Sequence, residues 1–229
     1  MSWRLDDRHG GAVQALAILL AASAAFGGMA GPAAAREGDG AGGNRPRLPV
    51  RFDSEIVRLV IEPDTVEVTG HYWLVCDPDF RHDVRLFYPY PEDSLLGGAH
   101  TLSLAWRTPG EPWREARFQE ADGMPAVPGT TSRRGARWQL PPAPGDTLEV
   151  RTVYRQALRS TYARYIVTTT RAWQRPLTRA RFEIELPPGA TPVRFSFPFR
   201  WHDAGDGGYY LFETTRFMPD EDIVVEWEP

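Results

Sequence analysis

Aromatic side chains next to arginine and histidine are the residues of this sequence most suited to binding. His71 and Trp73 share one face of an alternating segment, and Tyr165, Arg171 and Trp173 share one face of the segment YIVTTTRAW. Exposed tryptophan and tyrosine beside arginine suit a protein interface or the stacking of sugars. We therefore take these residues as binding candidates. The alternative is that both faces of their strands are covered, in which case the aromatic rings belong to the core.

Residues that could carry catalysis or hold a metal form no motif. The histidines that follow residue 35 lie singly along the chain, and none forms H-E-x-x-H or another close ligand pair. There is no G-x-S-x-G elbow and no S-x-x-K, and the absence of lysine weakens Schiff-base and P-loop chemistry. We predict no catalytic residue, no metal site and no cofactor. A serine triad or a carboxylate pair assembled from distant residues stays open, because such groups need not be adjacent in sequence.

Aspartates gather at two of the predicted turns. Asp77, Asp79 and Asp83 lie close together, and Asp203 and Asp206 flank a glycine-rich turn. Clustered carboxylates can hold calcium, which takes about six to eight oxygen ligands, but neither segment has the spacing of an EF-hand loop. Aspartate also forms turns through hydrogen bonds to its own backbone. We therefore expect turn formation at both places.

Residues 1–35 have the layout of a secretory signal peptide. A short polar leader with Arg4 and Arg8 precedes an apolar stretch of small residues, which ends in PAAA at residues 32–35. This layout with an A-x-A site predicts cleavage after Ala35, and hence a periplasmic or secreted protein. An uncleaved anchor is the alternative, although glycines and a proline cut the apolar run below the roughly 20 residues that span a bilayer.

Strict alternation of apolar and polar residues is the main signal in the rest of the chain. Residues 36–48 are rich in glycine and charge, which predicts a flexible lead-in. In residues 180–186, ARFEIEL, the even positions are apolar and the odd ones charged, as in a strand with one buried face. Strands are expected near residues 55–61, 65–76, 83–88, 101–107, 113–119, 135–140, 147–156, 161–171, 178–186, 192–200, 208–216 and 222–228.

Over residues 49–229 the pattern predicts an all-β fold: an antiparallel two-sheet β-sandwich, loosely immunoglobulin-like, with about ten strands. A closed barrel is the alternative. Residues 120–134 carry the weakest pattern, so we expect a surface loop there and a boundary if two subdomains exist. Cys76, the only cysteine, excludes an intrachain disulfide, and its register with Val66, Val68 and Leu74 predicts that it is buried.

Charge and pattern together favour a binding protein over an enzyme. With 26 basic and 30 acidic residues the net charge is -4, which gives no electrostatic footprint for nucleic acid or anionic lipid. We expect no nucleic-acid partner and no membrane insertion once the signal peptide is removed. The preferred hypothesis is a non-catalytic binding or assembly module for a protein partner in the cell envelope. The alternatives are an extracytoplasmic hydrolase acting on glycans or peptides, and a carbohydrate-binding sandwich with Trp73 and Trp173 as its platform.

Overall fold

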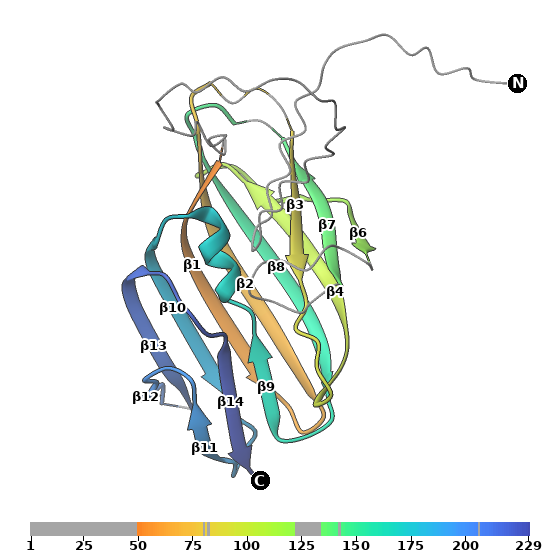
Figure 1. The fold of residues 1–229 in the computed structure, drawn as a ribbon, viewed down its shortest axis with the longest axis vertical. Coiled ribbons are helices and arrows are strands. Elements are labelled where there is room, and N and C mark those ends of the chain that lie inside the picture. The colour runs from red at the N-terminus through yellow and green to blue at the C-terminus, as the bar shows by residue number, and fades with distance from the viewer. Residues whose placement is uncertain (1–49, 80, 82, 122–133, 142, 206) are drawn as a thin grey trace, which may run out of the picture.

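Strands make up almost all of the regular structure (Figure 1). The computed structural model describes residues 50–121 and 134–229, except for residues 80, 82, 142 and 206. Within these residues the one helix is the short 3₁₀ helix η1 (Thr168–Trp173), and no helix is long and apolar enough to cross a membrane. The all-β prediction is therefore confirmed. The predicted signal peptide, the lead-in at 36–48 and residues 122–133 of the expected loop lie outside the described residues and stay predictions.

One large sheet of eight strands forms the body of the molecule. In spatial order its strands are β12 (Arg200–Asp203), β13 (Gly208–Phe217), β10 (Leu177–Glu185), β1 (Val50–Ile61), β2 (Thr65–Cys76), β8 (Thr147–Leu158), β4 (Leu96–Arg107) and β5 (Arg114–Glu115). β1 and β10 run parallel, whereas every other neighbouring pair is antiparallel. The predicted purely antiparallel arrangement is wrong at this pairing. Alternation specifies a strand but not its neighbour, and the chain between β1 and β10 passes through eight of the other strands.

Two small sheets cover one face of the large sheet, and both lie in front of it in Figure 1. One consists of β3 (Val84–Pro89), β7 (Gly135–Leu140) and β6 (Phe118–Ala121), and the other of β11 (Thr191–Phe195), β14 (Ile223–Glu228) and β9 (Tyr162–Tyr165). The described residues therefore form three sheets rather than the two that were predicted, and fourteen strands rather than about ten.

The core lies between the large sheet and the small sheets, where the alternation places it. In β2 the even positions from Val66 to Cys76 are buried and the odd positions are half-buried, as predicted. In β10 the buried side chains are those of Leu177, Ala180, Phe182 and Ile184. Burying each large apolar side chain contributes about 1.5–3 kcal/mol, so this face holds the layers together.

The predicted strand at 161–171 is wrong beyond Tyr165. β9 ends at Tyr165, and the chain then turns into η1. The side chain of Asp222 binds the backbone at the start of this turn. The Oδ1 atom of Asp222 accepts hydrogen bonds from the backbone N–H groups of Val167 and Thr168, each at 3.1 Å. The turn ends at Gln174, whose φ of 56° lies in the left-handed region. Residues on both sides of this turn therefore cannot share one strand face.

The predicted strand at 192–200 is also interrupted. β11 ends at Phe195, and the backbone N–H of Phe199 donates to the carbonyl of Phe197, which is a tight turn. The alternation of the sequence places Val193 and Trp201 on the apolar face of such a strand, yet they are 60% and 58% exposed. The alternation there is real in the sequence, but it spans two strands that belong to different sheets.

Candidate functional site

The face of the large sheet that points away from the small sheets, called the open face below, is built from paired charges. Its side chains are the ones that alternate with the core residues of β1, β2, β8, β10 and β13. Glutamate and arginine meet across neighbouring strands here. The pairs are Arg58–Glu185 at 2.6 Å, Arg155–Glu67 at 2.9 Å and Arg179–Glu213. A surface of this kind suits solvent or a polar partner and is not the inside of a second apolar layer.

Two of the predicted binding candidates, His71 and Trp73, lie on the open face and touch each other. Their ring centroids are 4.1 Å apart, and the ring of Trp113 lies 5.5 Å from His71. Glu149 lies opposite Trp73 on β8, and Arg107 lies opposite Glu149 on β4, so the ladder brings both to the same place. We call these five residues the open-face cluster.

Glu149 holds the open-face cluster together. Its Oε2 atom accepts hydrogen bonds from Arg107 Nε at 2.9 Å and Arg107 Nη2 at 2.7 Å, and lies 3.2 Å from His71 Nε2. The guanidinium of Arg107 also lies over the ring of Trp113, 4.5 Å from its centroid. Hydrogen bonds between charged groups are strong and directional. The aromatic rings are therefore held in place, while His71 and Arg107 remain 29% and 30% exposed and can be reached by a partner.

The protonation of His71 follows from its surroundings. Partial burial lowers its pKa below the ordinary 6.5, and this outweighs the opposing effect of Glu149. The imidazole is thus neutral near pH 7, and because a carboxylate only accepts, Nε2 carries the proton that His71 donates. A histidine oriented in this way resembles a general base. Among the described residues, however, no serine, threonine or cysteine forms a hydrogen bond with His71, so a nucleophile is not in place.

The other three candidates are not part of the cluster. Tyr165 and Trp173 are 1% and 6% exposed, so the expectation of exposed aromatic rings is wrong for both. The Tyr165 hydroxyl meets the hydroxyl of Tyr72 at 3.0 Å in the core, and the Trp173 ring packs on Phe52. Arg171 is exposed on η1. Tyr165 is buried on β9, whereas the turn at η1 exposes Arg171 and carries Trp173 into the core.

The residues that the sequence did not reveal are Arg107, Trp113 and Glu149. They come from β4, from the connection to β5, and from β8, and only strand pairing brings them to His71. The alternation of β8 places Glu149 on the open face, but nothing in the local sequence shows that it is buried there, at 8% exposure.

The acidic turns have the predicted character where they are described. The backbone N–H of Asp79 donates to Asp77 Oδ1 at 3.1 Å, and the backbone N–H of Gly205 donates to Asp203 Oδ1 at 2.9 Å. Asp206 lies outside the described residues. Among the residues that are described, no group of three or more His, Cys, Asp or Glu side chains could hold a metal ion.

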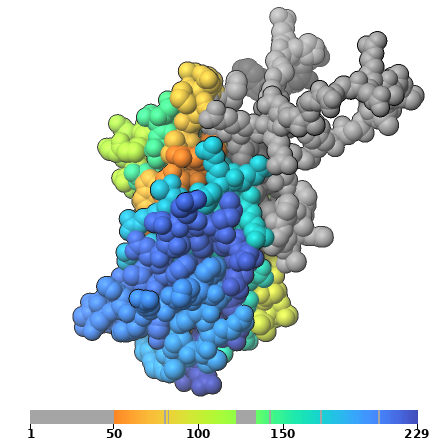
Figure 2. All heavy atoms as spheres, turned by 60° about the vertical axis from the view of Figure 1, so that its left-hand side comes forward, coloured from red at the N-terminus to blue at the C-terminus, as the bar shows by residue number. Residues whose placement is uncertain are grey.

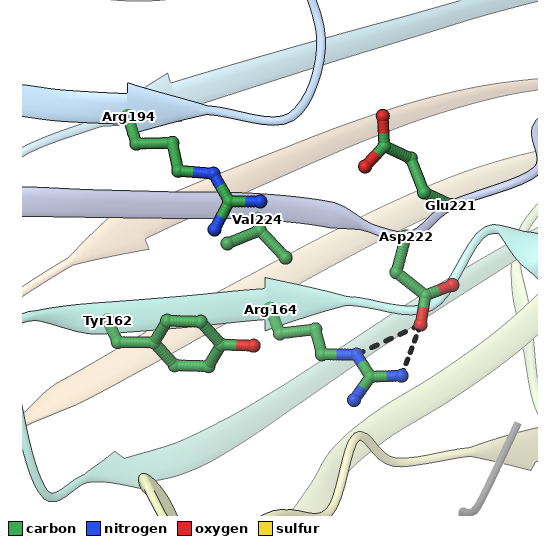
Figure 3. A pocket seen from close by; sticks show the side chains of 6 residues that line it. All are labelled: Tyr162, Arg164, Arg194, Glu221, Asp222 and Val224. Carbon is green, nitrogen blue, oxygen red and sulfur yellow. Dashed lines mark hydrogen bonds and ion pairs between the residues drawn. The ribbon is translucent and has the colours of Figure 1, made fainter.

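A hollow of about 290 Å³ lies on the outer side of the small sheet β11–β14–β9 (Figure 3). It is lined by Tyr162, Arg164, Arg194, Glu221, Asp222 and Val224. Asp222 Oδ2 accepts from Arg164 Nε at 2.9 Å and from its Nη2 at 2.5 Å, and Arg194 pairs with Glu226 at 2.9 Å. Both arginines are thus already engaged by carboxylates of this chain. Asp222 therefore holds η1 against β9. The hollow is a weaker candidate for a binding site than the open-face cluster.

Within the part of the chain that the structure describes, the core contains one acid without a hydrogen-bond partner. Glu55 on β1 is 1% exposed, and within the described residues neither of its carboxylate oxygens forms a hydrogen bond. Burial raises its pKa from 4.5 to about 8. A perturbed acid often marks a functional site, but Glu55 faces the interior, so we expect it to affect the pH dependence of stability and not binding.

Comparisons with known proteins extend only to the fold. No protein-family model matches the sequence, and a comparison with curated proteins gives no match. A protein from Legionella pneumophila, provisionally described as nutrient-binding, is similar with a TM-score of 0.59 and 14% identity, over 79% of this chain and 67% of that chain. An M1 zinc metallopeptidase from Deinococcus radiodurans has a TM-score of 0.43 and 14% identity over 78% of this chain, which spans only 42% of the peptidase.

Proposed function

We propose that this protein is a non-catalytic binding module that docks a protein partner through the open-face cluster. The observation that carries the proposal is a pair of tryptophans, Trp73 and Trp113, held in place on a solvent-facing sheet by Arg107, Glu149 and His71. Tryptophan and arginine are the residue types that most often dominate the energy of protein interfaces. Side chains that are already fixed lose little conformational entropy on binding, which favours affinity.

The surroundings of the cluster also support a protein interface. The ion pairs of the open face, such as Arg155–Glu67 and Arg58–Glu185, are partly exposed and lie further along the same strands, so the aromatic rings belong to an otherwise polar face. Aromatic residues within a polar surface are common in such interfaces. The proposal includes export to the cell envelope, supported by the layout of residues 1–35, and a β-sandwich-type scaffold, supported by small sheets that cover only one face of the large sheet.

Glycan binding is the second candidate, and the rings of Trp73 and Trp113 beside hydrogen-bonding groups favour it. Its platform would consist of these two residues, because Trp173 is buried. A hydrolase is the third candidate, favoured by the His71–Glu149 pair. It would require a nucleophile that the described residues do not bring to His71.

Substitution of one tryptophan tests the proposal. The full chain is expressed with an affinity tag in a secreting bacterial host, and partners are captured from its envelope extract with the wild type, with Trp73→Ala and with Trp201→Ala. Trp201 is the matched control, because it is 58% exposed but lies on β12, at the other edge of the sheet from β5. That edge belongs to the blue side of the molecule in Figure 2.

We expect a discrete partner with the wild type and with Trp201→Ala, and a loss of at least tenfold with Trp73→Ala, the size of effect that truncating a central aromatic anchor has. Equal capture by Trp73→Ala would contradict the proposal. Turnover of an ester, peptide or glycan substrate that is abolished by His71→Ala would instead establish the hydrolase.

A further inference from the structure

His71 is the residue of the open-face cluster whose charge can change near neutral pH. Histidine ordinarily titrates close to physiological pH, whereas carboxylates and guanidinium groups ordinarily keep their charges there. The imidazole contacts both aromatic anchors, with its centroid 4.1 Å from that of Trp73 and 5.5 Å from that of Trp113. A change in the charge of His71 therefore takes place inside the proposed docking surface.

The charged side chains around His71 balance one another when its imidazole is neutral. On β8, Glu149 and Arg151 lie on the open face, and Arg151 is directly opposite His71. On β4, Arg107 lies opposite Glu149. On β5, Glu115 lies in the same row as Arg151, two strands away. Two carboxylates thus accompany two guanidinium groups, and protonation of His71 adds a positive charge that this group does not offset.

The strand on the other side of His71 does not offset that charge either. Ile56 on β1 lies directly opposite His71 and is apolar. Charged residues elsewhere on this side of the open face are already paired with one another. The pairs are Arg51–Asp53 at 3.1 Å, Arg58–Glu185 at 2.6 Å, Arg155–Glu67 at 2.9 Å, Arg181–Glu183 at 2.7 Å and Arg179–Glu213.

Docking favours the neutral form of His71. In the free protein partial burial lowers the pKa of His71, and the two neighbouring arginines lower it further, against the opposing effect of Glu149. The side chain is still 29% exposed, so a partner that covers Trp73 and Trp113 removes more water from it. A charge that loses water without gaining a partner of opposite sign is unfavourable. Protonation of His71 therefore works against docking.

The second ring nitrogen of His71 leads to the same result. Nε2 donates its proton to Glu149, which leaves Nδ1 as an acceptor. Among the described residues Nδ1 has no hydrogen-bond partner, and it is not one of the fully buried polar atoms, so solvent or a partner can reach it. An N–H group of a partner can bind to Nδ1 only while the imidazole is neutral, because the imidazolium carries a proton on both nitrogens.

We propose that His71 makes docking at the open-face cluster sensitive to pH: the partner binds when the imidazole is neutral and is released when it is protonated. This rests on the proposed function and names how that site is regulated. One proton separates the two forms. The association constant should therefore be halved at the pKa of His71 in the free protein, and below that pH it should decrease by up to about tenfold per pH unit.

Capture at several pH values tests the proposal. The full chain is expressed with an affinity tag, purified after secretion, and used in limiting amount to capture the partner from envelope extract of the same host at pH 8, 7, 6 and 5. The variants are His71→Gln, which cannot gain a charge, and the matched control His202→Gln. His202 is also exposed and stacks on Tyr209, with 5.0 Å between the ring centroids, but it lies on β12 at the far edge of the sheet. An NMR titration of the imidazole signals, assigned with His71→Gln, gives the pKa of His71 in the free protein.

We expect capture by the wild type and by His202→Gln to be nearly constant from pH 8 to pH 7 and to be halved at the pKa that NMR gives for His71. For His71→Gln the ratio of capture at pH 5 to capture at pH 8 should be close to one. Capture that is independent of pH in the wild type, that increases in acid, or that decreases equally in the wild type and in His71→Gln would overturn the proposal. If His71→Gln captures too little partner at pH 8 to give a ratio, the wild type decides: release whose midpoint does not coincide with the pKa of His71 overturns the proposal. Circular dichroism melting shows whether each variant is folded.

The same capture experiment separates this proposal from the proposed function. If Trp73→Ala loses the partner at pH 8 while capture by the wild type does not depend on pH, the docking surface stands and the pH sensitivity is wrong. If Trp73→Ala captures as much partner as the wild type at pH 8, or if the wild type captures none, the docking surface itself is wrong and this proposal fails with it.

Discussion

Replacing Glu55 by glutamine should make the protein more stable at pH 8 while leaving its stability near pH 5 almost unchanged. Glu55 lies on β1 between Tyr72 on β2 and Ala180 on β10, and its side chain points into the core. Neither carboxylate oxygen has a hydrogen-bond partner among the described residues. A charge at this place is therefore unfavourable, because nothing replaces the water that the carboxylate loses on folding.

The magnitude follows from the pKa, which burial raises from 4.5 to about 8 in the folded protein. Below pH 4.5 Glu55 is protonated in both the folded and the unfolded chain, so its carboxyl group does not change the free energy of unfolding with pH. Above pH 4.5 the unfolded chain loses this proton, whereas the folded protein still holds it. Between pH 4.5 and 8 the free energy of unfolding then decreases with rising pH, by about 1.4 kcal/mol per pH unit. Above pH 8 both states are ionised and the loss levels off, at a total on the order of 5 kcal/mol.

Urea unfolding followed by tryptophan fluorescence, at several values between pH 5 and pH 8.5, measures this directly. Glutamine has the same shape and no charge, so the advantage of Glu55→Gln over the wild type should grow with pH. Glu67→Gln is the control, because Glu67 pairs with Arg155 at a partly exposed position. An advantage of Glu55→Gln that is the same at pH 5 and pH 8 would refute the reasoning, since it would mean that Glu55 does not change its protonation on folding.

Other predictions concern packing, the η1 turn and the cysteine. Gly70→Ala should destabilise the protein by about 1–3 kcal/mol, because an added Cβ would lie 1.8 Å from the Tyr72 hydroxyl. Gly98→Ala is the control: an added Cβ there would have no atom within 4 Å, so the same urea titration should show no change in stability. Asp222→Ala should cost about 3 kcal/mol and lower the melting temperature by about 10 °C, because it leaves the half-buried Arg164 and two backbone N–H groups without their acceptor. An unchanged melting temperature would show that η1 is held by other contacts. Cys76 should resist a thiol reagent in the folded state and react once urea unfolds the chain, because burial raises its pKa to about 11.

Local patterns predicted the parts of the fold that depend on local physics. The alternation of β2 and β10 specified which side chains are buried, including Cys76, because a strand has only two faces and water is excluded from one of them. Proline, glycine and aspartate marked most of the turns for the same kind of reason. Asp77, for example, accepts a hydrogen bond from the backbone two residues later.

Parts of the fold that depend on distant residues were not predictable in this way. The parallel pairing of β1 with β10 and the division of the small sheets depend on tertiary packing. The turn after Tyr165 depends on Asp222, which lies 55 residues beyond Val167 in the sequence. Likewise, Glu149 reaches His71 only through the pairing of β2 with β8. His71 and Trp73 were found because they are close in sequence, and Arg107 and Trp113 were missed because they are not.

Oxidative footprinting of the tryptophans tests the central claim, that the open-face cluster is an interface, most directly. Hydroxyl radicals are applied to the isolated protein and to an envelope preparation that contains it, and oxidation of each tryptophan is measured by mass spectrometry. We predict that Trp73 and Trp113 become protected in the envelope preparation while Trp201, which is 58% exposed on the opposite edge strand, is oxidised equally in both. Equal oxidation of Trp73 in the two samples, or protection of Trp201 alone, would contradict the claim.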